Sequence, residues 1–134
     1  MVAALLATGA TIRCMRDPTR GGVASACNEI ALTSNVGIQL DEAAIPVRQE
    51  VRGACELLGL DPLYIANEGK LLAFVAPETA ERVLDRIRKH PLGSQAAIIG
   101  TVDHGEAGRV RMETVIGGMR AVEMLAGEQL PRIC

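Results

Sequence analysis

Aromatic residues are scarce in this sequence, which has one tyrosine, one phenylalanine and no tryptophan among 134 residues. Surfaces that stack nucleic-acid bases need several aromatic side chains. Binding to a phosphate backbone needs an excess of positive charge, whereas the formal net charge is −2 at pH 7. The composition therefore argues against binding to nucleic acid.

Long hydrophobic runs are also missing. The longest, LLAFVA and AAII, are far shorter than the roughly 20 residues that a membrane-spanning helix needs. The opening MVAALLATGA has no basic residue before its apolar stretch and does not read as a signal peptide. With 49% hydrophobic and 22% charged residues, the chain has the composition of a single folded domain. We expect it in the cytoplasm, without membrane contact.

No two cysteines form a C-x-x-C pair, although the chain has four, Cys14, Cys27, Cys55 and Cys134. Their wide and uneven spacing argues against a zinc site and against a disulfide framework. Cys27 and Cys55 fall on the apolar faces of expected helices, so we expect both to be buried. Cys134 is the last residue of the chain.

Hydrophobic spacing predicts strands that alternate with helices. The expected strands are residues 11–15, 36–41 and 71–76, and the expected helices are residues 23–33, 46–58 and 77–90. Residues 95–103 and 109–113 are expected to form a β-hairpin or a close strand pair, and residues 117–125 a final short helix. This alternation predicts a two-layer α/β sandwich with a mixed sheet covered by helices.

The first segment that could carry chemistry is MRDPTRGG, residues 15–22, just before an expected helix. Its glycines let main-chain N–H groups approach an oxyanion, and the start of a helix adds a partial positive charge. Arg16, Thr19 and Arg20 add donors that suit phosphate. The spacing is neither that of a P-loop nor G-x-G-x-x-G. Anion binding and ordinary helix capping, for which Asp17 is suited, both remain open.

The second candidate is Glu68, which lies in the turn ANEGK directly before an expected strand. A loop residue presented by a rigid strand is well placed for chemistry, although most glutamates in such turns are simply solvated. His90 and His104 have no third partner near in sequence, and we assign them no role.

The third candidate is the end of the chain, GEQLPRIC. From Gly127 to Cys134 an extended chain reaches about 20–25 Å. Gly127 offers a hinge and Pro131 stiffens the segment. The terminal carboxylate disfavours the Cys134 thiolate, and Arg132 partly offsets that effect. We therefore expect an accessible thiol at the end of a flexible arm.

Together, MRDPTRGG, NEGKLLAFV and the terminal GEQLPRIC resemble the carboxy-terminal domain of the HypE family of hydrogenase maturation factors, the carbamoyl dehydratases. The similarity runs along the whole chain. The wider superfamily, which includes aminoimidazole ribonucleotide synthetase and selenophosphate synthetase, implies the same α/β fold. On this resemblance, residues 1–126 are the synthetase-type domain and residues 127–134 are a flexible tail.

The activity implied by this resemblance is the ATP-dependent conversion of a carbamoyl group on Cys134 into a thiocyanate, which supplies cyanide to the iron of nickel–iron hydrogenase. Glu68 is the implied base that takes protons from the nitrogen. The MRDPTRGG loop is implied to face the phosphates of ATP, and the residues before Cys134 to support the tail. The implied loop residues are Asp17, Thr19, Arg20, Gly21 and Gly22, and the implied tail residues are Pro131, Arg132 and Ile133.

The implied partners are a carbamoyltransferase that loads the terminal cysteine and an iron-holding complex that receives the nitrile. Family members also have an amino-terminal domain that supplies most of the ATP and Mg²⁺ site and the homodimer contact, and we expect this chain to lack it. We therefore expect no metal site, no bound cofactor and no activity in the chain alone. Two other interpretations stay open: a docking module without chemistry of its own, and a purine-pathway or selenophosphate relative that acts on a small substrate.

Overall fold

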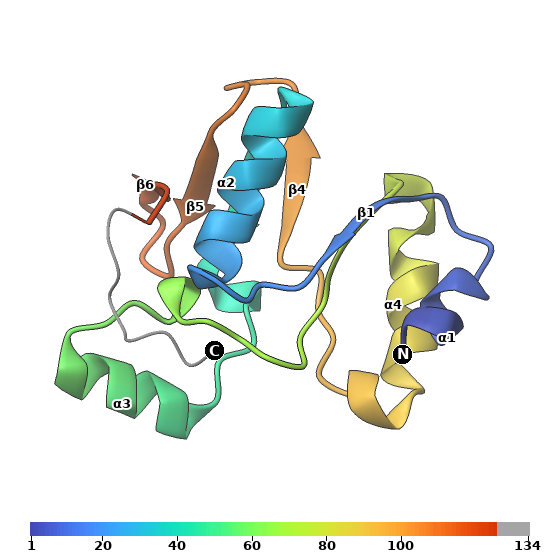
Figure 1. Cartoon of the computed structure of the whole chain (residues 1–134), viewed down its shortest axis with the longest axis horizontal. Coiled ribbons are helices and arrows are strands. Elements are labelled where there is room, and N and C mark those ends of the chain that lie inside the picture. The colour runs from blue at the N-terminus through green and yellow to red at the C-terminus, as the bar shows by residue number, and fades with distance from the viewer. Residues whose placement is uncertain (126–134) are drawn as a thin grey trace.

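The computed structural model describes residues 1–125, so the predicted tail lies outside the described residues (Figure 1). The helices are α1 (Val2–Leu6), α2 (Gly22–Ser34), α3 (Gln49–Leu58) and α4 (Ala80–Arg88). The strands are β1 (Ile12–Arg16), β2 (Gly37–Asp41), β3 (Leu72–Val75), β4 (Gly100–Asp103), β5 (Val110–Glu113) and β6 (Met119–Ala121). Short 3₁₀ turns are η1 (Glu42–Ala44), η2 (Pro62–Tyr64), η3 (Pro77–Thr79) and η4 (Pro91–Gly93).

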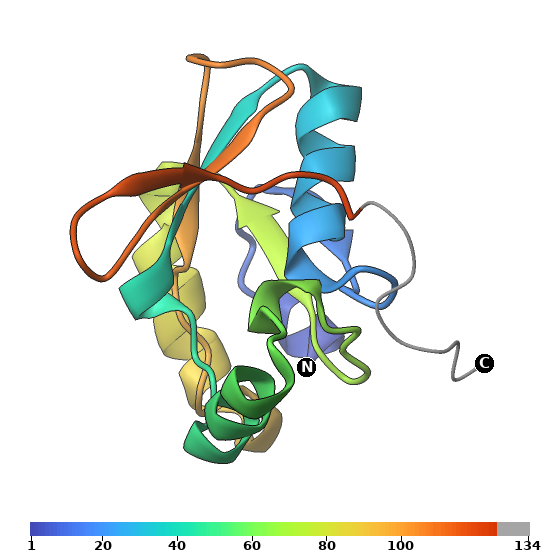
Figure 2. The same ribbon diagram turned by 90° about the vertical axis from the view of Figure 1, so that its left-hand side faces the viewer.

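A four-stranded mixed sheet with the order β4-β2-β5-β6 is the centre of the fold. Strand β2 is antiparallel to β4 and parallel to β5, and β6 is antiparallel to β5. Helix α2 covers one face of this sheet, as Figures 1 and 2 show. Strands β1 and β3 pair antiparallel as a separate two-stranded sheet.

Two hydrophobic clusters lie on either side of the two-stranded sheet. The larger cluster packs α2 against β2 and β5, and the smaller one joins α1 to α4. Strand β3 contributes to both clusters, because successive side chains of a strand point to opposite faces. Phe74 packs against the larger cluster and Val75 against the smaller one. The two-stranded sheet therefore connects the two cores.

The predicted fold class is confirmed, and α2, β2, α3, β3 and α4 lie in or near their expected ranges. Helix α1 was not predicted; its Leu5 is buried against α4. The apolar stripe predicted to pack inward on α3 is only partly buried, because Cys55 is buried while Val51 and Leu58 are exposed. Within residues 1–125 no helix has the length and apolar character needed to span a membrane.

The β-hairpin predicted from residues 95–103 and 109–113 is wrong. Strands β4 and β5 do not pair with each other, because β2 lies between them and forms ladders with both. The turn that joins them instead reaches across the end of β2, where the Gly108 N–H donates to Val36 O at 2.9 Å.

The final helix predicted over residues 117–125 is also wrong, because β6 occupies Met119–Ala121. Gly117 adopts φ +83° in a tight turn, in which the Thr114 N–H donates to Gly118 O at 2.7 Å. A left-handed glycine of this kind reverses the chain. The glycine pair therefore marks a hairpin turn between β5 and β6.

Burial of two cysteines is confirmed: Cys27 is 2% exposed and Cys55 is 6% exposed, while Cys14 is half-buried. Burial raises the pKa of Cys27 from 9.0 to about 12, because an apolar surrounding disfavours the charged thiolate. Cys27 is therefore a core residue that stays protonated and unreactive at physiological pH.

We predict that Cys27 resists alkylation in the folded chain. Below pH 9, the higher pKa lowers its thiolate fraction about a thousandfold, and burial blocks access as well. Among the three cysteines of residues 1–125, iodoacetamide at pH 8, followed by peptide mass mapping, should label Cys14 first and Cys27 last. The same reaction in urea is the control, in which the difference should disappear; equal labelling in the folded chain would contradict the prediction.

Candidate functional site

The loop before α2 is built around one buried proline and two left-handed glycines. Pro18 is among the most fully buried side chains of the described chain. Gly21 and Gly22 have φ values of +65° and +62°, a conformation that L side chains rarely adopt. Gly21 is the N-cap of α2, and no side chain caps this helix start. Main-chain N–H groups at the start of α2 are thus left without a side-chain acceptor.

The chain at η2 packs directly on this glycine turn. A Cβ atom on Gly22 would lie 2.3 Å from Leu63 O and 2.6 Å from Ile65 O, so only glycine fits. Beyond η2, the Asn67 N–H donates to Pro18 O at 3.0 Å. These contacts place the turn that carries Glu68 beside the loop at residues 17–22.

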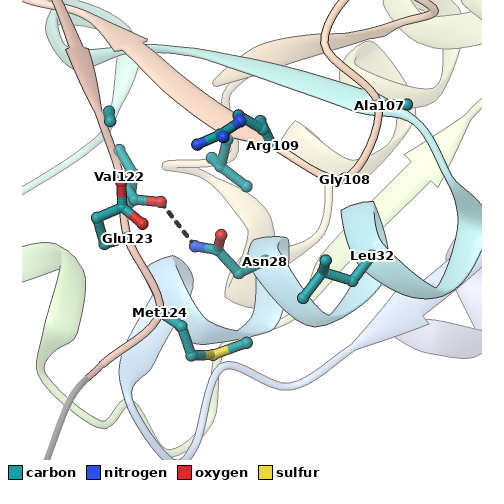
Figure 3. A pocket seen from close by; sticks show the side chains of 10 residues that line it. Asn28, Leu32, Ala107, Gly108, Arg109, Val122, Glu123 and Met124 are labelled. Carbon is teal, nitrogen blue, oxygen red and sulfur yellow. Dashed lines mark hydrogen bonds between the residues drawn. The ribbon is translucent and has the colours of Figure 1, made fainter.

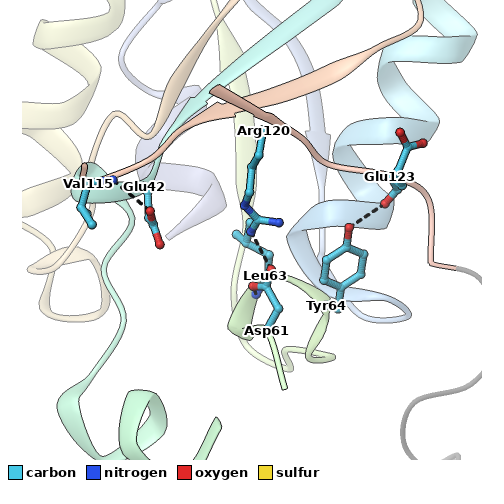
Figure 4. Close-up of polar contacts among 7 residues, drawn as sticks. All are labelled: Glu42, Asp61, Leu63, Tyr64, Val115, Arg120 and Glu123. Atoms are coloured by element: carbon cyan, nitrogen blue, oxygen red, sulfur yellow. Dashed lines mark hydrogen bonds and ion pairs between the residues drawn. The ribbon is translucent and has the colours of Figure 1, made fainter. Parts of the chain in front are cut away.

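The last described segment of the chain is tied to the same place. Arg120 forms an ion pair with Asp61 at 2.6 Å, and the Tyr64 hydroxyl donates to Glu123 O at 3.0 Å (Figure 4). Burial raises the pKa of Tyr64 above its ordinary value, and Arg120 offsets part of the rise. Tyr64 is therefore a neutral hydrogen-bond donor at physiological pH.

Helix α2 also holds this segment. The Asn28 amide donates to Val122 O at 2.8 Å and to Ala24 O at 2.9 Å, and a hollow of about 380 Å³ lies beside these residues (Figure 3). Leu125 lies three residues after Val122. A Cβ atom added to Gly21 would lie 3.5 Å from the Leu125 Cβ. The chain thus leads from β6 to the loop at the start of α2.

The structure brings together two of the three predicted motifs, and Leu125, the last described residue before the third, lies beside them. Asp17 and Arg20 are exposed, Thr19 is half-buried, and none of these three side chains forms a hydrogen bond with a residue among 1–125. Glu68 is exposed in its turn.

Other predicted residues are engaged elsewhere or lie outside the described chain. Arg16 pairs with Glu29 on the side of α2. Of the two interpretations left open for the loop, helix capping by a side chain is not seen at the start of α2. The predicted tail residues all fall outside the described range 1–125; they are Pro131, Arg132, Ile133 and Cys134.

The residues that hold these segments together were not singled out from the sequence. Asp61 caps η2 through its carboxylate, which accepts from the Leu63 N–H at 2.9 Å, and it also pairs with Arg120. The signals in the sequence that could have indicated these residues are the Asp61-Pro62 pair and Tyr64, the single tyrosine of the chain. Among the described residues there is no group of three or more His, Cys, Asp or Glu side chains that could hold a metal ion.

Residues 1–113 match the family described as AIR synthase related protein, C-terminal domain, and the chain belongs to this family. Among curated proteins, it is 61% identical over all 134 residues to carbamoyl dehydratase HypE of Azotobacter vinelandii. The match covers 100% of this chain and 39% of that protein. The chain thus spans well under half the length of the curated relatives that it matches.

Solved structures agree with this comparison. Escherichia coli HypE, described as a hydrogenase maturation protein, has a TM-score of 0.91 and 43% identity, over 99% of this chain and 41% of that one. A HypE structure in complex with ATP has a TM-score of 0.84 and 50% identity, over 92% and 38%. A HypE–HypF complex has a TM-score of 0.85 and 40% identity, over 91% and 39%.

We predict that Gly22→Ala destabilises the fold more than Gly59→Ala. Both glycines have left-handed φ angles, +62° and +66°, but a Cβ on Gly59 meets nothing within 4 Å. Left-handed strain alone costs about 1–2 kcal/mol, and the clash with the η2 carbonyls should add at least about 2 kcal/mol. Urea unfolding of both variants measures the difference. Equal losses of unfolding free energy would show that the contact with η2 does not matter.

Proposed function

We propose that this chain is the carboxy-terminal part of a HypE carbamoyl dehydratase, a cytoplasmic enzyme of nickel–iron hydrogenase maturation. Residues 1–126 form its synthetase-type domain, and residues 127–134 form a tail that carries the acceptor cysteine. The identity to HypE proteins along the full length supports this assignment.

The observation that carries the proposal is the meeting of three separate segments. The glycine turn at the start of α2, the turn that carries Glu68 and the last described residue, Leu125, lie side by side. Gly21 lies next to Leu125, Gly22 contacts η2, and the Asn67 N–H donates to Pro18 O. A tail that continues from Leu125 therefore starts beside both the loop and the carboxylate.

The reaction consumes ATP, whose phosphates fit the residues at the start of α2. The helix has no side-chain cap, no acidic residue in its first turn and two glycines that bare the main chain, and such a helix start favours an anion. Arg20 and Thr19 are the adjacent donors. Because no metal-binding cluster exists among residues 1–125, we assign no Mg²⁺ ligand to them.

In the proposed reaction, the amide oxygen of the carbamoylated Cys134 attacks the γ-phosphorus of ATP, and ADP leaves. One N–H proton is lost, which gives a phosphorylated imidate. Removal of the second N–H proton forms the carbon–nitrogen triple bond as the carbon–oxygen bond breaks and phosphate leaves. Phosphorylation is needed because an amide oxygen is a poor leaving group, and Glu68 is the base that takes the protons.

The proposed partners follow from the steps before and after this reaction. A carbamoyltransferase loads Cys134, and the solved HypE–HypF complex supports such a partner. An iron-holding maturation complex accepts the nitrile. The amino-terminal part of the protein completes the ATP and Mg²⁺ site and forms the homodimer.

We predict that Cys134 gains first a carbamoyl and then a cyano group. The chain is joined to the amino-terminal part of the Azotobacter vinelandii relative and incubated with HypF, ATP and a carbamoyl donor. Intact mass should report both adducts in turn, and Cys134→Ala should abolish both. Carbamoylation without loss of water would favour a carrier module that has no catalysis of its own.

Glu68→Gln should slow the dehydration by roughly 10²–10⁴-fold, the usual contribution of a general base, and should leave carbamoylation unchanged. Glu81→Gln is the matched control, since Glu81 is also exposed but lies in the first turn of α4. An unchanged dehydration rate in Glu68→Gln would assign the proton transfer to another group.

We also predict that the purified 134-residue chain alone hydrolyses no ATP above background, because the larger part of the ATP site is proposed to lie in the rest of the protein. A coupled ADP-release assay measures this. Turnover by the chain alone would refute the proposed division of the site.

A further inference from the structure

Helix α3 has an apolar face that other elements among residues 1–125 cover only in part. Figure 1 shows α3 standing away from the four-stranded sheet, and it packs mainly on η2. Along its face runs a groove of about 360 Å³, in which Val51 and Leu58 are 39% and 69% exposed. The groove is lined by Glu50, Val51, Ala54, Cys55, Leu58, Leu60 and Ile65.

The end of the described chain is held next to this groove. The Tyr64 hydroxyl binds Glu123 O at 3.0 Å, and Ile65, the next residue after Tyr64, lines the groove. The nine residues 126–134 continue from this point. Extended, they can reach about 30 Å, about twice the roughly 15 Å length of a ten-residue helix such as α3.

The composition of this segment matches the groove. Its large apolar residues are Leu130 and Ile133, and Pro131 between them favours a polyproline II conformation. In that conformation, residues three apart share one face and lie about 9 Å apart. Val51 and Leu58, seven residues apart on α3, are about 10 Å apart. The spacing of the two apolar pairs therefore agrees.

The charges agree as well. Glu50 is the one acidic side chain that lines the groove, and Arg132 lies between the two apolar residues of the segment. We propose that residues 126–134 bind in this groove, with Leu130 and Ile133 against Val51 and Leu58 and with Arg132 facing Glu50.

In this bound state Cys134, the residue after Ile133, lies near Leu58 and about one helical turn from Cys55, which also lines the groove. The groove thus gives the terminal thiol a sheltered position between reactions. The proposal makes no use of carbamoyl chemistry, so its failure would leave the proposed function standing.

Thiol trapping in the purified chain tests the proposal. Mild oxidation with copper phenanthroline, followed by peptide mapping without reduction, identifies the partner of Cys134. We expect an intramolecular Cys55–Cys134 disulfide, although Cys14 is the more exposed thiol. Pairing of Cys134 mainly with Cys14, or only between chains, would overturn the proposal if cysteines introduced at Leu58 and Ala54 also fail to trap Cys134.

Leu58→Cys and Ala54→Cys offer further trapping positions if the geometry at Cys55 is unsuited to a disulfide. Both should trap Cys134 at least about tenfold faster than Glu81→Cys on α4, because docking raises the effective concentration of the thiol. Equal rates at all three positions, with no pairing to Cys55, would refute the docking.

Charge placed in the groove should release the segment. Leu58→Glu should lower the yield of the Cys55–Cys134 disulfide severalfold, while Leu57→Glu should leave it unchanged. Leu57 is the matched control, because it precedes Leu58 on the same helix and is 89% exposed, outside the groove. An equal effect of the two variants would mean that the groove does not hold the tail.

Discussion

The approach of Gly22 to the carbonyls of Leu63 and Ile65 is the contact on which the candidate site depends. It joins the first residue of α2 to the backbone of η2 at distances that leave no room for a Cβ atom. One neighbour of this contact along the chain is the loop at residues 17–21, and another is the turn with Glu68. A single steric requirement therefore brings a helix start without a side-chain cap and the turn that carries Glu68 into the same place.

Strand β6 and the segment after it are held by polar contacts from different elements. Asn28 comes from α2, Asp61 caps η2 and Tyr64 lies in η2. Each such bond contributes only about 0.5–1.5 kcal/mol to stability. Because these contacts act on Arg120, Val122 and Glu123 in turn, they orient the backbone more than any one of them stabilises the fold. Helix α2 and the turn η2 together thus set the direction of the chain after β6.

Local patterns in the sequence were enough to predict α2, β2 and β3, because their apolar residues repeat at the period of a helix or a strand. The same patterns could not predict that β2 lies between β4 and β5, since strand order depends on contacts between distant residues. Glu68 and the glycine loop were found as separate motifs. Their proximity depends on the fit between Gly22 and η2, which no periodicity encodes. The exposed stripe of α3 was read as core because spacing reports amphipathicity and not what covers it.

The place of β2 in the sheet has a consequence for synthesis on the ribosome. Both of its partner strands come from the last third of the described chain. The hydrogen-bond partner of Asn28, Val122 O, is synthesised 94 residues later. Until those residues emerge, both edges of β2 remain unpaired, and an unpaired strand edge can join another chain. The nascent chain therefore carries an aggregation risk that ends only when β4 and β5 have emerged.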